Sequence, residues 1–237
     1  MNRSIKLFVF LLGLYFTNPL VAESKLSEIV VSPSQRPTTI FDSLNSVEVI
    51  TQEQIQSFGY TTVDEILSHS SSISIGSNGG HGQTKSIFMR GTESNHTKVL
   101  INGVALNPGT LGVASIQHIS VEMLDRIEIS KGSMSTLYGR DTIGGVINII
   151  TKKNYNDDKT QVFISTGRDE TNKIGFNKSF SYNSHLLSIN YMNINTDGYK
   201  AKTSSTKNHG YENDNLNIDY SYSYNNNLFE LNFYQSD

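Results

Sequence analysis

The stretch Leu216-Asn-Ile-Asp-Tyr-Ser-Tyr-Ser-Tyr224 places an apolar or aromatic side chain at every second position and a polar one between. A period of two is that of a β-strand with one apolar and one polar face. Other segments after residue 153 alternate in the same way, and nine of the twelve Tyr of the chain lie in this part. They are Val162–Ile164, Ile174–Phe180, Leu187–Tyr191 and Phe229–Phe233. The pattern predicts a meander of five antiparallel strands.

The first 22 residues differ from the rest. Arg3 and Lys6 precede the apolar run Leu7–Phe16, and Ala22 lies where a signal peptide would be cleaved. The run is about half the ~20 residues that a helix needs to cross a bilayer. We therefore predict a signal peptide over residues 1–22 and export of the mature chain.

Export favours one interpretation of the meander. In an exported protein, Tyr-rich alternating strands of about ten residues are typical of an outer-membrane β-barrel with aromatic girdles. Periodicity alone also fits a soluble β-sandwich, which stays open at this point.

Composition excludes several classes of function. The chain has 237 residues, with 19 basic and 22 acidic side chains and a net charge of -3, which does not suggest a partner nucleic acid. There is no Cys, so disulfide scaffolds, thiolate metal sites and thiol nucleophiles are excluded.

The part before residue 154 has short apolar stretches separated by turn residues. Glu53–Ser57 is expected to be helical and to end at Gly59, and Thr62 with Glu65 forms a capping box that begins a second helix. Asn102-Gly103 between two apolar runs predicts a tight hairpin. Further strands are expected at Val47–Ile50, Ser86–Arg90, Arg126–Ser130 and Val146–Thr151. These elements predict a compact mixed α/β domain.

No motif for catalysis is assembled. The glycine-rich stretch Gly76–Gln83 is not a phosphate-binding loop. That motif needs Gly directly before its Lys and a helix after it, whereas here Thr84 precedes Lys85 and no long helix follows. The six His are scattered without the spacing of metal ligands, and there is no G-x-S-x-G turn. We therefore do not expect an enzyme.

Several blocks follow one another in an order and spacing that resemble the plug of TonB-dependent outer-membrane receptors. They are Ile87-Phe-Met-Arg-Gly91, Val99-Leu-Ile-Asn-Gly-Val104, Arg126-Ile-Glu-Ile-Ser-Lys-Gly132, Leu137-Tyr-Gly139 and Gly144-Gly-Val-Ile-Asn-Ile-Ile150. Near the mature N-terminus, Glu28-Ile-Val-Val31 resembles a TonB box.

The resemblance implies an α+β plug domain followed by the first antiparallel strands of a transmembrane β-barrel. Its expected divisions are a signal peptide over 1–22, the TonB box and a linker over 23–36, the plug over 37–153 and barrel strands over 154–237. A barrel wide enough for a plug has about 22 strands. Since five are predicted here, we expect a barrel that is incomplete in this chain, as in a fragment, a truncated product or half of a split gene.

The resemblance also implies active uptake across the outer membrane of a Gram-negative bacterium. Glu28, Ile29, Val30 and Val31 would bind TonB of the TonB–ExbB–ExbD complex, because a short extended segment can add a strand to a partner sheet. The outer face of the strands would contact membrane lipid.

Within the family, two loops resemble the ligand loops of cobalamin receptors. The resemblance implies ligand contact by Ser77, Asn78, Gly79, Gly80, His81, Gly82 and Gln83 in the first loop and by Leu106, Asn107 and Pro108 in the second. Glu212 and Asp214 would match part of a calcium site, although Lys200 stands where that pattern has an acidic residue. A receptor for an iron-siderophore or haem is the alternative within the family. A secreted binding module or adhesin with a β-sandwich is the alternative from another class.

Overall fold

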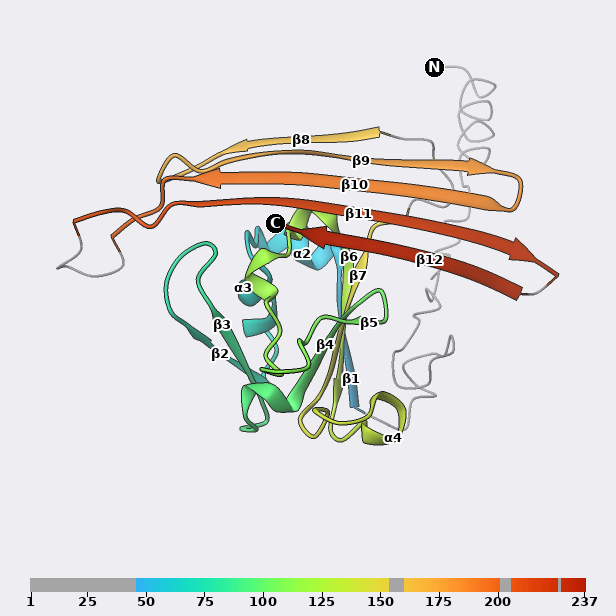
Figure 1. Ribbon diagram of the computed structural model, residues 1–237, viewed down its shortest axis with the longest axis horizontal. Helices are drawn as coiled ribbons and strands as arrows, with labels where there is room; N and C mark the ends of the chain where they lie inside the picture. The colour runs from blue at the N-terminus through green and yellow to red at the C-terminus, as the bar shows by residue number, and fades with distance from the viewer. Residues whose placement is uncertain (1–45, 154–159, 201–205, 226) are drawn as a thin grey trace, which may run out of the picture.

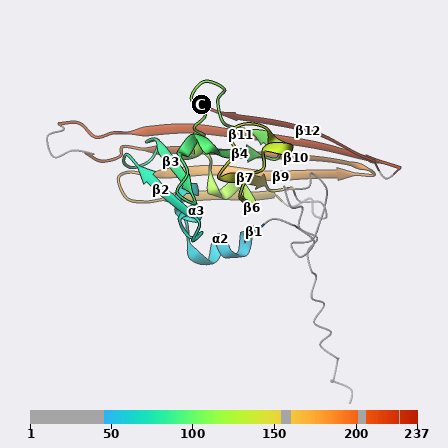
Figure 2. The same cartoon turned by 90° about the horizontal axis from the view of Figure 1, so that it is seen from below.

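The computed structural model describes residues 46–153, 160–200, 206–225 and 227–237. The predicted signal peptide and the predicted TonB box lie outside these residues. The described part contains a mixed N-terminal domain, residues 46–153, and a long sheet, residues 160–237, that lies across it (Figure 1). Figure 2 shows the domain over the middle of the long sheet.

The N-terminal domain is built on a five-stranded sheet of order β1-β6-β7-β4-β5. Its strands are β1 (Ser46–Thr51), β4 (Thr97–Ile101), β5 (Val104–Ala105), β6 (Leu124–Lys131) and β7 (Gly145–Thr151). Neighbours are antiparallel except β4 and β7, which are parallel. Asn102 and Gly103, with φ of 48° and 85°, form the tight turn that joins β4 to β5. The predicted hairpin and the four predicted strand regions are confirmed.

Two short helices begin at the predicted caps. Helix α2 (Gln52–Phe58) has Thr51 at its N-cap and ends at Gly59, whose φ is 68°. Helix α3 (Val63–Ser68) follows Thr62, whose backbone N–H donates to the Glu65 carboxylate at 3.2 Å. In both helices the side chains therefore satisfy N–H groups that the first turn leaves unpaired.

Some elements were not expected from the sequence. Strand β2 (Ile73–Ser77) pairs with β3 (Lys85–Met89) as a separate antiparallel hairpin, with the glycine-rich loop at its tip. Three 3₁₀ turns, η3 (Ser94–His96), η4 (Ile116–His118) and η5 (Val121–Met123), and helix α4 (Ser135–Tyr138) fill the connections.

The domain has a continuous apolar core between its sheet and the helices. Side chains of β6 and β7 form its centre, and Ile127, Ile129, Ile147 and Ile149 are fully buried. Ile66 and Leu67 of α3 are fully buried against them. At about 25 cal/mol per Å² of apolar surface removed from water, this core is the main stabilising contribution to the domain.

The long sheet is a meander of order β12-β11-β10-β9-β8. Its strands are β8 (Thr160–Thr166), β9 (Asn172–Tyr182), β10 (His185–Thr196), β11 (Tyr211–Tyr224) and β12 (Asn227–Ser236), each antiparallel to the next. The predicted meander is confirmed. Strand β11 begins five residues before the alternating stretch Leu216–Tyr224, so Glu212 and Asp214 lie in a strand and not in a loop.

The two faces of the long sheet are inverted relative to those of a soluble protein. The face against the domain is mainly polar and buried, with Asn177, Ser179, Ser188, Asn190, Asn213, Asn215, Asn217, Asp219 and Ser221 each at most 5% exposed, and it also buries Leu186, Met192 and Ile194 of β10. The opposite face carries exposed apolar side chains, namely Val162, Ile164, Ile174, Phe176, Phe180, Phe229, Leu231 and Phe233. A β-sandwich packs apolar faces against one another, so this arrangement is not that of a sandwich.

Asp219 is central to the contact between the two parts. The residue is 3% exposed, and its carboxylate meets donors from the domain and from the long sheet. It accepts hydrogen bonds from Asn102 (3.3 Å), Thr151 (3.1 Å), Asn217 (2.5 Å) and Asn232 (2.6 Å), and Lys153 Nζ lies at 3.6 Å. Because Asn102 and Thr151 stand at the ends of β4 and β7, this carboxylate fixes the domain on the sheet.

Replacing Asp219 with Ala should loosen the domain from the long sheet, because several buried donors lose their acceptor at once. We expect the free energy of local opening at residues 97–101 and 145–151 to fall by about 1–3 kcal/mol. Native-state hydrogen exchange measures it. Ser223→Ala, at an exposed position of the same strand, is the matched control. Equal protection in both variants would contradict the role of Asp219.

Candidate functional site

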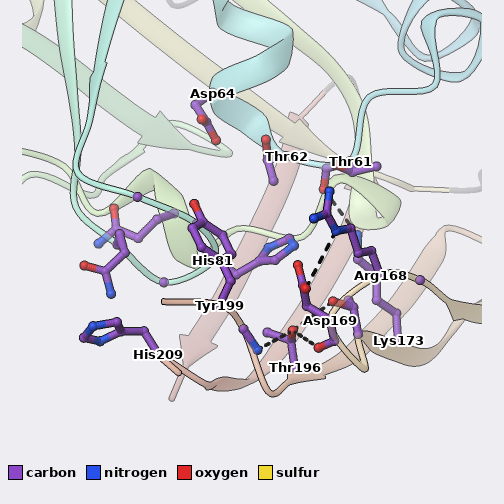
Figure 3. Close-up of a pocket in the computed structure, with 18 of the residues that line it drawn as sticks. Thr61, Thr62, Asp64, His81, Arg168, Asp169, Lys173, Thr196, Tyr199 and His209 are labelled. Atoms are coloured by element: carbon purple, nitrogen blue, oxygen red, sulfur yellow. Dashed lines mark hydrogen bonds and ion pairs between the residues drawn. The ribbon is translucent and has the colours of Figure 1, made fainter. Parts of the chain in front are cut away.

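A cavity of about 520 Å³ opens between the N-terminal domain and the long sheet. It lies at the end of the sheet where the β2–β3 loop meets the β8–β9 turn and the β10–β11 connection (Figures 1 and 3). The domain lines it with residues 79–83 and 85, the beginning of α3 at 61, 62, 64 and 65, and Gln117 and Glu122. The sheet lines it with residues 165, 167–169, 171, 173, 196, 198, 199 and 209.

Lys85 builds the first wall of the cavity. Its side chain is only 9% exposed and donates to Ser77 Oγ at 2.7 Å and to the carbonyl of Gly79 at 3.1 Å. Asp64 Oδ2 lies 3.0 Å from the same ammonium group. The cation is therefore paired where burial would otherwise be costly, and it holds the start of the glycine-rich loop against α3.

His81 extends into the cavity from the tip of this loop (Figure 3). Burial lowers the pKa of His81 below its ordinary value, and the positive charges of Lys173 and Lys85 lower it further. Asp64 and Glu65 oppose this effect without cancelling it. The imidazole is therefore neutral at neutral pH.

Lys173 of β9 joins the sheet to the opposite wall. Its ammonium lies 2.8 Å from Glu122 Oε1 and donates to the carbonyl of Thr61 at 3.2 Å. The other carboxylate oxygen of Glu122 and the Oε1 of Gln117 are buried and have no hydrogen-bond partner among the described residues. Both atoms are acceptors that no donor of the described residues satisfies.

The charges around the cavity nearly balance. Four carboxylates, from Asp64, Glu65, Glu122 and Asp169, face three cations, from Lys85, Arg168 and Lys173. Each cation has an acidic partner, and the Arg168–Asp169 pair is the longest at 3.8 Å. A balanced, paired set of charges gives no strong field for an anionic ligand.

The structure brings one of the two predicted ligand loops to the cavity. Gly79, Gly80, His81, Gly82 and Gln83 line it, whereas Ser77 and Asn78 stand beside it at the base of the loop.

The second loop lies elsewhere. Leu106, Asn107 and Pro108 do not line this cavity, and Leu106 packs against the domain core. The Asn107 amide accepts from the N–H of Val99 at 2.7 Å and donates to the carbonyls of Thr97 and Gly112. Asn107 therefore shapes its own loop, and ligand contact there stays a prediction.

The predicted calcium ligands lie on the outer face of β11. Asp214 accepts from the hydroxyl of Tyr191 at 2.6 Å and from Asn193 at 3.1 Å, and Glu212 is exposed two residues away. Two carboxylates supply too few oxygens for the roughly six to eight that calcium takes. Within the described ranges, no group of three or more His, Asp or Glu is placed to hold a metal ion.

Sequence reasoning missed several residues of the cavity, among them Lys85, Glu122, Lys173 and Tyr199. Glu122 and Lys173 stand 51 positions apart in the chain, so no local pattern connects them. In the sequence, Lys85 stands out only as a residue that fails to complete a phosphate-binding motif.

In the described part of the chain, no helix is both long enough and apolar enough to cross a membrane.

Comparisons with known proteins agree on one family. Residues 39–146 match the family model described as TonB-dependent Receptor Plug Domain. The "Vitamin B12 transporter BtuB" of Vibrio vulnificus YJ016 is 34% identical over 194 residues, which are 80% of this chain and 32% of that protein. The transporter of the same name from Photobacterium profundum is 34% identical over 153 residues, or 65% of this chain and 25% of its own. The chain thus spans a quarter to a third of these relatives.

Solved structures of similar fold come from receptors that are named for other ligands. The siderophore receptor PirA from Acinetobacter baumannii matches 88% of this chain and 33% of its own, with a TM-score of 0.66 and 22% identity. The pyoverdine outer membrane receptor FpvA from Pseudomonas aeruginosa matches 86% of this chain and 29% of its own, with a TM-score of 0.71 and 16% identity. At these identities the likeness establishes the fold only.

The depressed pKa of His81 gives a prediction for pH dependence. Below its ordinary pKa of about 6.5, His81 takes up a proton in the unfolded chain more readily than in the folded protein, which holds it neutral. The contribution of neutral His81 to the stability of the fold is therefore complete above about pH 6.5. It is lost as the pH falls from there through the folded pKa. His81→Gln cannot titrate, so its Tm should fall less than that of the wild type between pH 7.5 and 5. Parallel Tm curves for the two proteins would show that His81 carries no such penalty.

Proposed function

Because this chain belongs to the TonB-dependent receptors, whose plug-domain model matches residues 39–146, we propose that it serves in the uptake of cobalamin across the outer membrane. The mixed domain is the plug, and the strands of the long sheet form the first part of the wall around it. Energy for uptake would come from TonB through the predicted box at Glu28–Val31.

The inverted faces of the long sheet support a place in the outer membrane. Lipid accepts the exposed apolar face, while the polar face packs on the plug. Aromatic rings gather at the end with the β9–β10 and β11–β12 turns, where His185 and Tyr222 stack with centroids 4.6 Å apart and Tyr182 is 75% exposed. Aromatic side chains at this level match the girdle at a membrane–water interface.

The polar lining of the cavity and its paired charges favour cobalamin over an anionic iron chelate as the ligand. Cobalamin is a large corrinoid whose rim bears several amide groups, and these can exchange hydrogen bonds with polar groups that line the cavity, such as the side-chain amide of Gln83. An anionic iron chelate would be better served by unpaired cations, which the described cavity residues do not provide. The relatives named as vitamin B12 transporters support the same choice.

Replacing both Asn78 and Gln83 with Ala should weaken cobalamin binding about tenfold or more, since the loop would lose the amide of Gln83 in the cavity and the amide of Asn78 at its base. Equilibrium binding of cyanocobalamin to the native outer-membrane protein measures it, and Asn227→Ala, at the far end of the long sheet, is the control. An unaltered affinity would contradict the assignment of this loop. A wild-type protein that binds a ferric siderophore and not cobalamin would contradict the ligand.

Val30→Pro should abolish energised uptake and leave cobalamin binding near its normal value. Proline lacks the N–H that strand addition to a partner sheet requires. Uptake of radiolabelled cobalamin by intact cells, compared with binding at 0 °C, separates the two steps. Uptake at the wild-type rate would contradict the TonB box.

A further inference from the structure

Two aromatic rings contact the glycine-rich loop at its glycines. A Cβ placed on Gly80 would lie 2.8 Å from Cε1 of Tyr199, and one placed on Gly82 would lie 2.6 Å from Cε2 of Tyr211. Real Cβ atoms essentially never come this close to another atom, so a side chain at either position would require the ring to shift. Gly82 also has a φ of 71°, which side chains other than hydrogen seldom adopt. The spacing of the two glycines therefore matches the positions of the two rings.

Both rings come from the stem of the β10–β11 connection. Tyr199 lies three residues after the end of β10, and Tyr211 is the first residue of β11. The N–H of His209 donates to the carbonyl of Tyr199 at 3.2 Å, which holds the two sides of the stem together. Thr196 is tied to the β8–β9 turn through the carbonyl of Asp169 at 2.9 Å. The rings are thus carried by a hydrogen-bonded part of the long sheet.

Tyr211 also contacts the plug at a second residue, His118. Its hydroxyl lies 2.8 Å from Nδ1 of His118, and the two rings stack with centroids 5.7 Å apart. Burial lowers the pKa of His118, so its imidazole is neutral and can share one hydrogen with the phenol. The carbonyl of His118 accepts from Ser236 of β12 at 3.3 Å. The ring of Tyr211 is therefore fixed at its polar end while its edge rests on Gly82.

We propose that Tyr199 and Tyr211 are positioning residues that clamp the glycine-rich loop of the plug in the conformation that meets the ligand. The clamp acts on the backbone of Gly80 and Gly82, so it sets the place of His81, which stands between them. The inference rests on the proposed function only in that the loop is taken to contact cobalamin. The clamp itself is a property of the protein without ligand.

The first test measures the order of the loop in the native outer-membrane protein without ligand. The N–H groups of Asn78 and Gln83 are hydrogen-bonded within the loop, at 3.3 Å each, and report on it by hydrogen exchange. We expect Tyr199→Ala and Tyr211→Ala to raise their exchange rates at least tenfold. Tyr182→Ala, an exposed ring at the opposite end of the sheet, should leave them unchanged. Unchanged exchange in both clamp variants would overturn the proposal.

The second test separates positioning from general stability. Tyr211→Phe keeps the ring on Gly82 and removes only the hydroxyl, so it should restore most of the protection that Tyr211→Ala loses. It should also restore cyanocobalamin affinity, which we expect to fall about tenfold in Tyr211→Ala. If Tyr211→Phe behaves like Tyr211→Ala, the ring contact is not what holds the loop and the clamp is wrong. Because Tyr199 is 47% exposed, its replacement tests the clamp even where Tyr211→Ala fails to accumulate.

The two tests decide separately whether the clamp exists and whether cobalamin is the ligand. If the wild type does not bind cyanocobalamin but the clamp variants still free the loop, the proposed ligand fails and the clamp stands. If cobalamin binds normally to variants whose loop exchanges freely, the ligand stands and the positioning role fails.

Discussion

The carboxylate of Asp219 is buried where the plug meets the long sheet, and a buried charge without partners would cost several kcal/mol. Its partners come from both sides, since Asn102 and Thr151 belong to the plug and Asn232 to a neighbouring strand of the sheet. Satisfying this one group therefore requires the ends of β4 and β7 to stand at a single place on the sheet. That requirement fixes the position of the plug, and the cavity lies along the same boundary.

The polar face of the long sheet explains why its strands have their pattern. Amide and hydroxyl groups of β9, β10 and β11 are almost fully buried, so they need partners that an apolar core could not give. The plug provides some of them at its surface, as at Asn190, Asn215 and Asn217, and neighbouring strands provide others. The plug keeps its own apolar core apart, between its sheet and helices. The apolar side chains of the long strands are left on the outer face, as a lipid environment requires. The plug thus buries its apolar side chains in a core, as a protein in water does, whereas the long sheet turns its apolar side chains outward, as a protein in lipid does.

The sequence predicts what depends on local rules. The alternation of Leu216–Tyr224, the Asn102-Gly103 turn and the Thr62–Glu65 cap each specify an element through neighbouring residues, and the structure contains all three. Strand β2 is not predicted from the sequence, because Ser and Gly interrupt its alternating pattern and only β3 pairs with it. The first residues of β11 are not predicted as strand either. Glu212 and Asp214 are charged, whereas the same face of the strand is apolar or aromatic from Leu216 onward. The cavity depends on contacts such as Lys173–Glu122, which only the folded chain brings together.

The cavity is bounded by one surface from the plug and one from the long sheet, so a ligand held in it would contact both. Lys173 and Glu122 pair across the boundary, and Tyr211 rests on Gly82 across it as well. A ligand that contacts both surfaces stabilises their closed arrangement by its own difference in affinity for the closed and open forms. By the same reciprocity, opening the boundary lowers the affinity for the ligand.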